Sequence, residues 1–206
     1  LAEEADDQPG IVVAADGAVT YRPFRAKGVA GDLENFYLPS RTDLVRRVAE
    51  KVVEVEGPLS FDLLARRVAA CWEIQRLTQR VRERLEQVLG AAAVERCVVG
   101  QRVFYWPCGG VPAAYRLFRR AGDDPRSARE LADIAPEEVA NAAARVLSQQ
   151  LRLPLEDLVR ETARMLGYQR TTRQMEPWLR EGIDLLIEQG RAAALDEWIS
   201  EVPSVR

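Results

Sequence analysis

Arginine and glutamine side chains recur around one predicted helix and the two strands expected after it. Six side chains carry this pattern: Arg76, Gln79, Arg80, Arg82, Arg96 and Arg102. The first four lie in or just before the helix, and the last two lie on the strands. Arginine and glutamine form bidentate contacts with guanine and adenine, and guanidinium groups also neutralise phosphates. The chemistry that these residue types suit is therefore contact with DNA, dominated by the phosphate backbone.

Acidic residues on the same helix favour a competing interpretation. Glu83 and Glu86 share its outward face with Gln79 and Arg82. They would repel phosphate, and they can also form i,i+4 ion pairs such as Arg82–Glu86 on a solvated helix. The arginine bias itself has a second explanation, because a GC-rich genome also favours arginine over lysine. Contact with the DNA backbone therefore remains a prediction, with weaker support for recognition of a base sequence.

The composition excludes most kinds of catalytic site. There is no histidine, which excludes Ser-His-Asp triads and histidine-containing zinc sites. Cys71, Cys97 and Cys108 form no CxxC pair, and we expect each to be a small buried residue in a reducing cytoplasm. Neither lysine belongs to a phosphate-binding P-loop, and no GxGxxG motif is present. We expect no enzyme activity, no metal and no cofactor.

Charge is distributed unevenly along the chain. The formal net charge is −3, with 29 basic and 32 acidic residues. Residues 41–106 hold 12 basic and 9 acidic residues, a balance of +3, whereas residues 136–206 hold 9 basic and 12 acidic residues, a balance of −3. A nucleic-acid contact is therefore expected in the first of these segments.

The 206 residues suffice for two small domains, each with its own core. No apolar run approaches the roughly 20 residues that a membrane span requires, so we expect a cytoplasmic location and no membrane partner. The chain begins with Leu1 rather than methionine. We expect it to be a piece of a longer polypeptide.

Three helices and a hairpin are predicted in the first half. An apolar stripe predicts a helix that starts at Thr42 and ends at Gly57-Pro58. Ser60 is suited to cap a second helix over 61–72, and a third helix runs over 78–89. Two strands, over 94–99 and 102–106, flank a two-residue turn that begins with glycine. This order is typical of a winged helix-turn-helix.

The second half repeats the pattern. Predicted helices start near Pro136, Pro154 and Thr172, and residues 191–199 are expected to contain a strand. At an offset of 94 residues, Leu64, Arg66, Ala69, Gln75, Arg76 and Thr78 match Leu158, Arg160, Ala163, Gln169, Arg170 and Thr172. The predicted fold is mainly α with small β-hairpins, in two tandem winged helix-turn-helix-like units. The predicted boundaries are 1–40 for an irregular N-terminal segment with a disordered acidic start, 41–107 for the first unit, 108–135 for a linker and 136–200 for the second unit.

An aromatic run, Phe104-Tyr105-Trp106, ends the first predicted unit. Aromatic side chains on a strand can stack on nucleic-acid bases. Because side chains alternate along a strand, we instead expect Phe104 and Trp106 to close the core under the helices, with Tyr105 on the other face.

Several motifs resemble an uncharacterised domain found at the C-terminal end of large bacterial superfamily I helicase-like proteins. They are Val52-Val53-Glu54-Val55-Glu56-Gly57-Pro58-Leu59, Leu64-Ala65-Arg66-Arg67-Val68, Trp72-Glu73-Ile74-Gln75-Arg76, Phe104-Tyr105-Trp106-Pro107 and Ala163-Arg164-Met165-Leu166-Gly167-Tyr168-Gln169-Arg170-Thr171. The resemblance covers residues 37–195, and Glu73 stands where the family usually has glycine. It supplies no catalytic residues. It implies an accessory module for DNA processing, with other domains of the parent polypeptide as partners.

Two functions follow as expectations. The first is a non-catalytic accessory domain of a helicase- or nuclease-type protein that contacts duplex DNA through its first unit. The alternative is a protein-interaction or dimerisation module without DNA contact, which the acidic balance and the broad apolar third helix of the second half favour.

Overall fold

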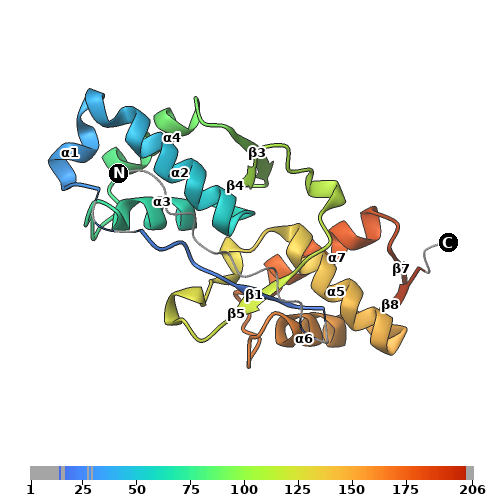
Figure 1. Ribbon diagram of the computed structural model, residues 1–206. Coiled ribbons are helices and arrows are strands. Elements are labelled where there is room, and N and C mark those ends of the chain that lie inside the picture. The colour runs from blue at the N-terminus through green and yellow to red at the C-terminus, as the bar shows by residue number, and fades with distance from the viewer. Residues whose placement is uncertain (1–13, 15–16, 27, 29, 203–206) are drawn as a thin grey trace.

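The computed structural model of the chain describes residues 14, 17–26, 28 and 30–202. In this part of the chain there are seven α-helices, eight short strands and three small sheets. Figure 1 shows α1 to α4 grouped on one side of the molecule and α5 to α7 on the other. The fold is therefore a mixed one, with helices and small sheets in both halves.

The three helices and the hairpin of the first group follow the predicted order, and a short strand that was not predicted lies between the first two helices. The group comprises α2 (Thr42–Glu56), β2 (Leu59–Ser60), α3 (Phe61–Ala70), α4 (Gln79–Leu89), β3 (Val94–Val99) and β4 (Arg102–Pro107). The Oγ atom of Ser60 accepts a hydrogen bond from the Leu63 N–H at 3.0 Å, which caps α3, and Thr78 caps α4 in the same way. Gly100 turns the hairpin with φ +58°. The strands form an antiparallel sheet in the order β2-β4-β3.

The second group has the same order of elements. It comprises α5 (Pro136–Gln150), β6 (Arg152–Pro154), α6 (Leu155–Met165), α7 (Glu176–Glu188), β7 (Ala192–Leu195) and β8 (Trp198–Glu201). Its antiparallel sheet has the order β6-β8-β7, which matches the order in the first sheet. The predicted strand within 191–199 is a hairpin of two strands. We call residues 42–107 the first unit and residues 136–202 the second unit.

The segments outside the two units are more structured than expected. Residues 108–135, predicted as a linker, contain β5 (Arg119–Ala121) and three short 3-10 helices. β5 pairs in parallel with β1 (Val19–Tyr21) from the predicted irregular segment, with Val19 opposite Arg119. Figure 1 shows this pair of strands close to α5 and α6. The predicted disorder of the acidic N-terminal residues falls on positions outside the described residues.

Helix α1 (Leu33–Tyr37) attaches the N-terminal segment to the first unit. Asp32 caps it by accepting a hydrogen bond from the Asn35 N–H at 2.9 Å. Phe36 is fully buried, and its ring meets Trp72 edge-on at 5.5 Å between centroids. Phe36 therefore packs into the core of the first unit and holds the N-terminal segment against it.

Strand β4 is buried on both faces, and its aromatic residues point in directions opposite to those expected. Tyr105 joins the core of the first unit. Phe104 and Trp106 face away from that core, where they pack with Ala135 and Tyr115 of the segment that leads to α5. Alternation along the strand was predicted correctly, but the prediction assigned the two faces the wrong way round. The second face of the strand is covered because residues 108–135, predicted as a linker, pack against it through Tyr115 and Ala135.

Two further observations complete the fold. Cys71 is buried as expected, whereas Cys97 is half-buried and Cys108 is exposed, so the prediction of three buried cysteines is wrong for Cys108.

No helix among the described residues has both the length and the apolar character needed to cross a membrane.

Candidate nucleic-acid interface

The start of α4 presents two of the predicted arginines together. Arg76 and Arg80 are exposed and line the same groove of about 370 Å³, which lies between α1 and α4. The Arg80 guanidinium lies over the Tyr37 ring, 4.2 Å from its centroid. The groove is also lined by Leu33, Ile74 and one acidic residue, Glu73. An anion at this end of α4 would meet two cations and the positive end of the helix dipole.

The outward face of α4 is largely neutralised. Arg82 forms an ion pair with Asp62 of α3, and the side chains of the two residues are 33% and 54% exposed. Gln79 donates a hydrogen bond to Glu83 at 3.1 Å, and Glu86 is exposed one turn further along. A surface ion pair of this kind contributes at most about 1 kcal/mol, so Arg82 can exchange Asp62 for another anion at small cost.

The two arginines of the hairpin have separate positions. Arg96 is exposed on β3 and lies directly across from Tyr105 of β4. Arg102 forms an ion pair with Glu181 of α7, and its guanidinium lies 4.0 Å from the centroid of the Trp178 ring. It also donates to the Ala132 carbonyl at 3.2 Å. Burial lowers the pKa of Arg102, while Glu181 opposes that shift. Arg102 therefore joins the two units and does not face solvent with Arg96.

A buried ionic cluster, absent from the sequence predictions, joins the first helices of the two units. Glu138, in the first turn of α5, is fully buried between Arg119 and Arg129. Arg119 also donates to the carbonyls of Glu56, at 2.7 Å, and Pro58, at 2.8 Å. The cation thus lies at the C-terminal end of α2 and the carboxylate at the N-terminal end of α5, as both helix dipoles favour.

The ionic state of this cluster follows from its partners. Burial would raise the pKa of Glu138, but Arg119 and Arg129 outweigh it and lower the pKa to about 2. Burial would lower the pKa of Arg119, but Glu138 raises it. Both groups are therefore charged at neutral pH, and each depends on the other because isolated buried charges are costly.

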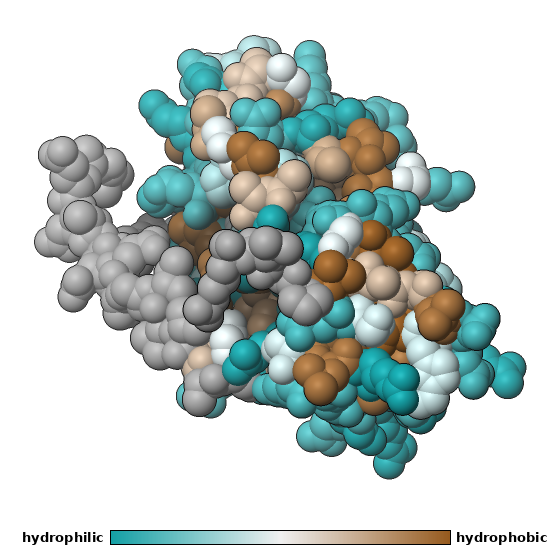
Figure 2. Space-filling view, turned by 90° about the vertical axis from the view of Figure 1, so that its right-hand side faces the viewer, coloured by the Kyte–Doolittle hydropathy of each residue, from teal (hydrophilic) through white to brown (hydrophobic). Residues whose placement is uncertain are grey.

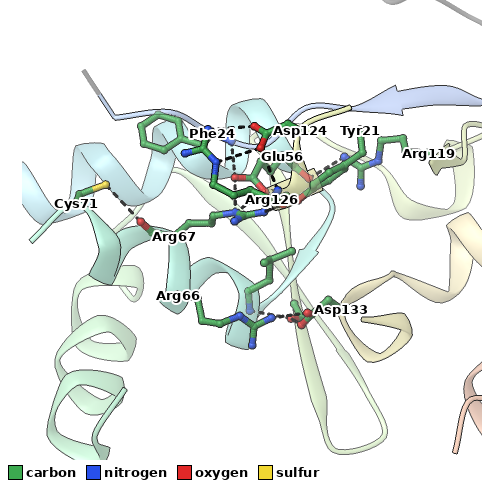
Figure 3. Close-up of polar contacts among 12 residues, drawn as sticks. Tyr21, Phe24, Glu56, Arg66, Arg67, Cys71, Arg119, Asp124, Arg126 and Asp133 are labelled. Carbon is green, nitrogen blue, oxygen red and sulfur yellow. Dashed lines mark hydrogen bonds and ion pairs between the residues drawn. The ribbon is translucent and has the colours of Figure 1, made fainter. Parts of the chain in front are cut away.

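A second carboxylate, Glu56 at the end of α2, ties the N-terminal segment to the first unit (Figure 3). The Tyr21 hydroxyl donates to Glu56, and so does the Phe24 N–H at 2.6 Å. Arg67 of α3 pairs with the same carboxylate at 2.9 Å. Burial, followed by the Glu56 charge, raises the pKa of Tyr21, which keeps its hydroxyl protonated and donating.

Asp133 holds the connecting segment on the start of α3. It accepts hydrogen bonds from the Ser60 hydroxyl and from Arg66. Ser60 therefore caps α3 and contacts the connecting segment with the same oxygen. Figure 3 shows Arg66 and Asp133 beside the cluster around Glu56. Arg66 thus contributes to the junction between the first unit and residues 108–135.

The described residues hold no group of three or more His, Cys, Asp or Glu side chains arranged to bind a metal ion. Burial raises the pKa of the Cys71 thiol to about 11, so it is not a thiolate at neutral pH. The candidate binding surface is therefore the start of α4, with its exposed arginines, together with Arg96 on β3.

Comparison with known proteins adds one finding. Residues 34–83 match a family model described as a protein of unknown function (DUF3320). No curated protein and no solved structure matches the chain. The matched stretch extends from α1 to the middle of α4 and includes Arg76, Gln79, Arg80 and Arg82. It covers about a quarter of the chain, and it supports the resemblance to an uncharacterised domain in this stretch.

Proposed function

We propose that this chain is a non-catalytic accessory module of a helicase- or nuclease-type DNA-processing protein, and that its first unit contacts the backbone of duplex DNA. The proposal treats each unit as a winged helix-turn-helix. The support is the order of three helices and a hairpin, with a short strand after the first helix that joins the sheet. Helicase parentage rests on the sequence resemblance alone.

The observation that carries the proposal is the contrast between α4 and α7, the third helices of the two units. Helix α7 contacts the hairpin of the first unit through Glu181 and Trp178, both of which meet Arg102. Helix α4 starts at an exposed surface that carries Arg76 and Arg80. In a helix-turn-helix the third helix enters the major groove, so an exposed third helix with cations is the one suited to DNA.

The proposed contacts are to phosphates. Arg76, Arg80 and Arg96 are exposed, and Arg82 becomes available when it leaves Asp62. Gln79 already bonds to Glu83, which disfavours base recognition by this glutamine. Arg102 is left out of the proposed contacts because it is held by Glu181.

Fluorescence anisotropy with a labelled DNA duplex tests this proposal. Each phosphate contact should contribute about −0.9 to the slope of log affinity against log salt. The double variant Arg76→Gln/Arg80→Gln should bind more weakly at every salt concentration and lower the magnitude of the slope by about 1.8. The matched control is Arg160→Gln/Arg164→Gln, which removes two exposed arginines from α6 of the second unit.

Absence of binding in low salt, or binding that does not depend on salt, would contradict the proposal. Equal losses in the two double variants would show that only net charge matters and would also contradict it. Circular dichroism of all three proteins controls for folding, because Arg80 stacks on Tyr37 and contributes to the packing of α1.

A second candidate function is a protein-interaction module. It is favoured by exposed apolar side chains on the sheet of the second unit, among them Leu195 at 76% and Trp198 at 40% exposure. This role and DNA contact involve different units, so one chain can carry both.

A further inference from the structure

The groove between α1 and α4 has an apolar lining as well as two arginines. Leu33, Tyr37 and Ile74 line it, and Leu33 is 50% exposed. Figure 2, by contrast, shows apolar residues scattered among polar ones over the second unit. Contact with the backbone of a duplex uses the cations and leaves the apolar lining without a partner, because the bases are stacked inside the duplex. The groove therefore suits a ligand that carries both a phosphate and an apolar ring.

The size of the groove limits what can enter it. Its volume of about 370 Å³ lies at the small end of the range of roughly 300–1,000 Å³ that ligand pockets occupy. A single nucleotide suits such a volume, whereas an extended strand or peptide needs a longer channel. Ligand pockets also combine apolar walls with a few polar groups that orient the ligand. The polar side chains that line this groove include Glu73, Gln75, Arg76 and Arg80.

These polar side chains are available to a ligand. Among the described residues, no ion pair or hydrogen bond is found for the side chains of Glu73, Gln75 and Arg76, and all three residues are exposed. Arg80 is also exposed, and its guanidinium lies over the Tyr37 ring without a carboxylate partner among the described residues. Two cations and one carboxylate leave an excess of one positive charge. The groove therefore favours an anionic ligand such as a phosphate group.

We propose that this groove holds an unpaired nucleotide at the end of a duplex that lies on the first unit. Its phosphate pairs with Arg76 and Arg80, and its base lies against Leu33 and Ile74. Unpaired bases stack on aromatic rings and on guanidinium planes, so the Arg80–Tyr37 pair suits such a base as well. This inference rests on the proposed DNA contact, and it names the class of DNA end that the same surface recognises.

Glu73 gives the groove a preference among bases. A carboxylate accepts hydrogen bonds and donates none, so it can accept one from the N4 amino group of cytosine. Thymine has a similar size but presents the O4 acceptor at that position, which a carboxylate repels. Glu73 has φ +55°, in the left-handed region that favours glycine, so the turn carries this carboxylate at a cost in backbone strain. We expect an unpaired cytosine to bind more tightly than an unpaired thymine.

Fluorescence anisotropy of the 206-residue chain with hairpin duplexes, labelled in the hairpin loop, tests this inference. A one-nucleotide cytosine overhang is placed on the 5′ end and on the 3′ end in turn. At one of these ends it should raise affinity about fivefold over the same duplex with a blunt end. Leu33→Ser should remove most of this gain and leave the affinity for the blunt duplex unchanged. Leu38→Ser is the matched control, because Leu38 is 44% exposed and lies outside the groove lining, and it should keep the gain.

The base preference has a separate variant. Glu73→Gln should bring the ratio of cytosine-overhang to thymine-overhang affinity toward one, because an amide both donates and accepts hydrogen bonds. The change in net charge affects both overhangs equally, so this ratio reports the contact with the base. A gain that is the same for cytosine and thymine overhangs in the wild-type protein would overturn the contact assigned to Glu73.

The remaining outcomes separate this inference from the proposed function. Binding of the blunt duplex with no gain from either overhang would overturn the inference and leave the proposed function standing. Absence of binding to every duplex would contradict the proposed function, and the inference with it. Equal losses of the gain in Leu33→Ser and Leu38→Ser would overturn the place assigned to the base. If a labelled acidic, leucine-containing peptide bound in a way that Leu33→Ser abolishes, with no gain from an overhang, the groove would belong to a protein partner instead.

Discussion

The two units share the order of their elements and of their strands, yet their third helices pack differently. In the second unit α7 lies close against α5 at Gly182, where an added methyl group would overlap Val139 and approach the Pro136 carbonyl. In the first unit Val81, Leu85 and Val88 place full apolar side chains between α4 and the core. One arrangement of elements thus supports two packing modes.

The surfaces differ as much as the interiors. Helix α4 starts with exposed arginines, whereas α7 holds Glu181 against Arg102 of the first unit. The edge strand β3 carries charges, whereas β7 carries none. The comparison teaches that a repeated architecture does not repeat its surface chemistry, because each unit leaves different side chains at its surface.

The largest effect is expected at the ionic cluster that joins the units. Glu138→Ala leaves Arg119 and Arg129 buried without their carboxylate, and it should lower the free energy of unfolding by about 3–5 kcal/mol. Urea denaturation followed by circular dichroism measures this loss. Glu161→Ala, which removes a surface partner of Arg164, is the control and should cost less than about 1 kcal/mol. Equal losses of unfolding free energy in the two variants would show that the buried ionic cluster does not hold the two units together.

Acid should weaken the same buried ionic cluster. The pKa of Glu138 is lowered to about 2 in the fold, so its stabilising effect is present above its ordinary range and is lost as pH falls toward 2. The stability difference between the wild-type protein and Glu138→Gln should therefore shrink as pH is lowered from 5 to about 2. Urea titrations at several pH values measure it. A difference that stays constant over this range would contradict the ionised state of Glu138.

Much of the local structure was predictable because its causes are local. Gly57 ends α2, Ser60 and Thr78 cap the next two helices, and Gly100 turns the hairpin. The capping residues and Gly100 each satisfy a local backbone requirement. Gly57 has an extended backbone, and its lack of a side chain makes room for the Val53 carbonyl.

The junction between the units was not predictable from such patterns. Arg119 and Glu138 are 19 positions apart, and Arg66 and Asp133 are 67 apart, so neither pair leaves a periodic signal. Arg102 was predicted as a phosphate contact from its place on a hairpin, but a distant glutamate, Glu181, holds it. Charge pairing between remote segments depends on tertiary packing, which helix and strand periodicity does not describe.

Gly182 offers a direct test of the close packing in the second unit. Gly182→Ala should lower the free energy of unfolding by about 1–3 kcal/mol, because the new methyl group overlaps Val139. The opposite sign is expected at an open, exposed helix position, where alanine stabilises by up to about 1 kcal/mol relative to glycine. Thermal denaturation of the variant shows whether the substitution lowers or raises the stability of the protein. Stabilisation would show that α5 and α7 have room between them and that the two units pack alike.

The smallest expected differences separate Arg102 and Arg82, two arginines of the first unit that each pair with a carboxylate. Arg102→Gln removes a partly buried cation that bonds to Glu181 and stacks on Trp178, and it should cost about 1.5 kcal/mol. Arg82→Gln removes the surface pair with Asp62 and should cost at most about 0.5 kcal/mol. The order should reverse in DNA binding, where Arg82→Gln weakens affinity and Arg102→Gln leaves it unchanged. Urea denaturation ranks the two variants by stability, and fluorescence anisotropy ranks them by DNA affinity. A variant that loses both stability and affinity would show that the contact with α7 and the proposed DNA-contacting surface are not separate.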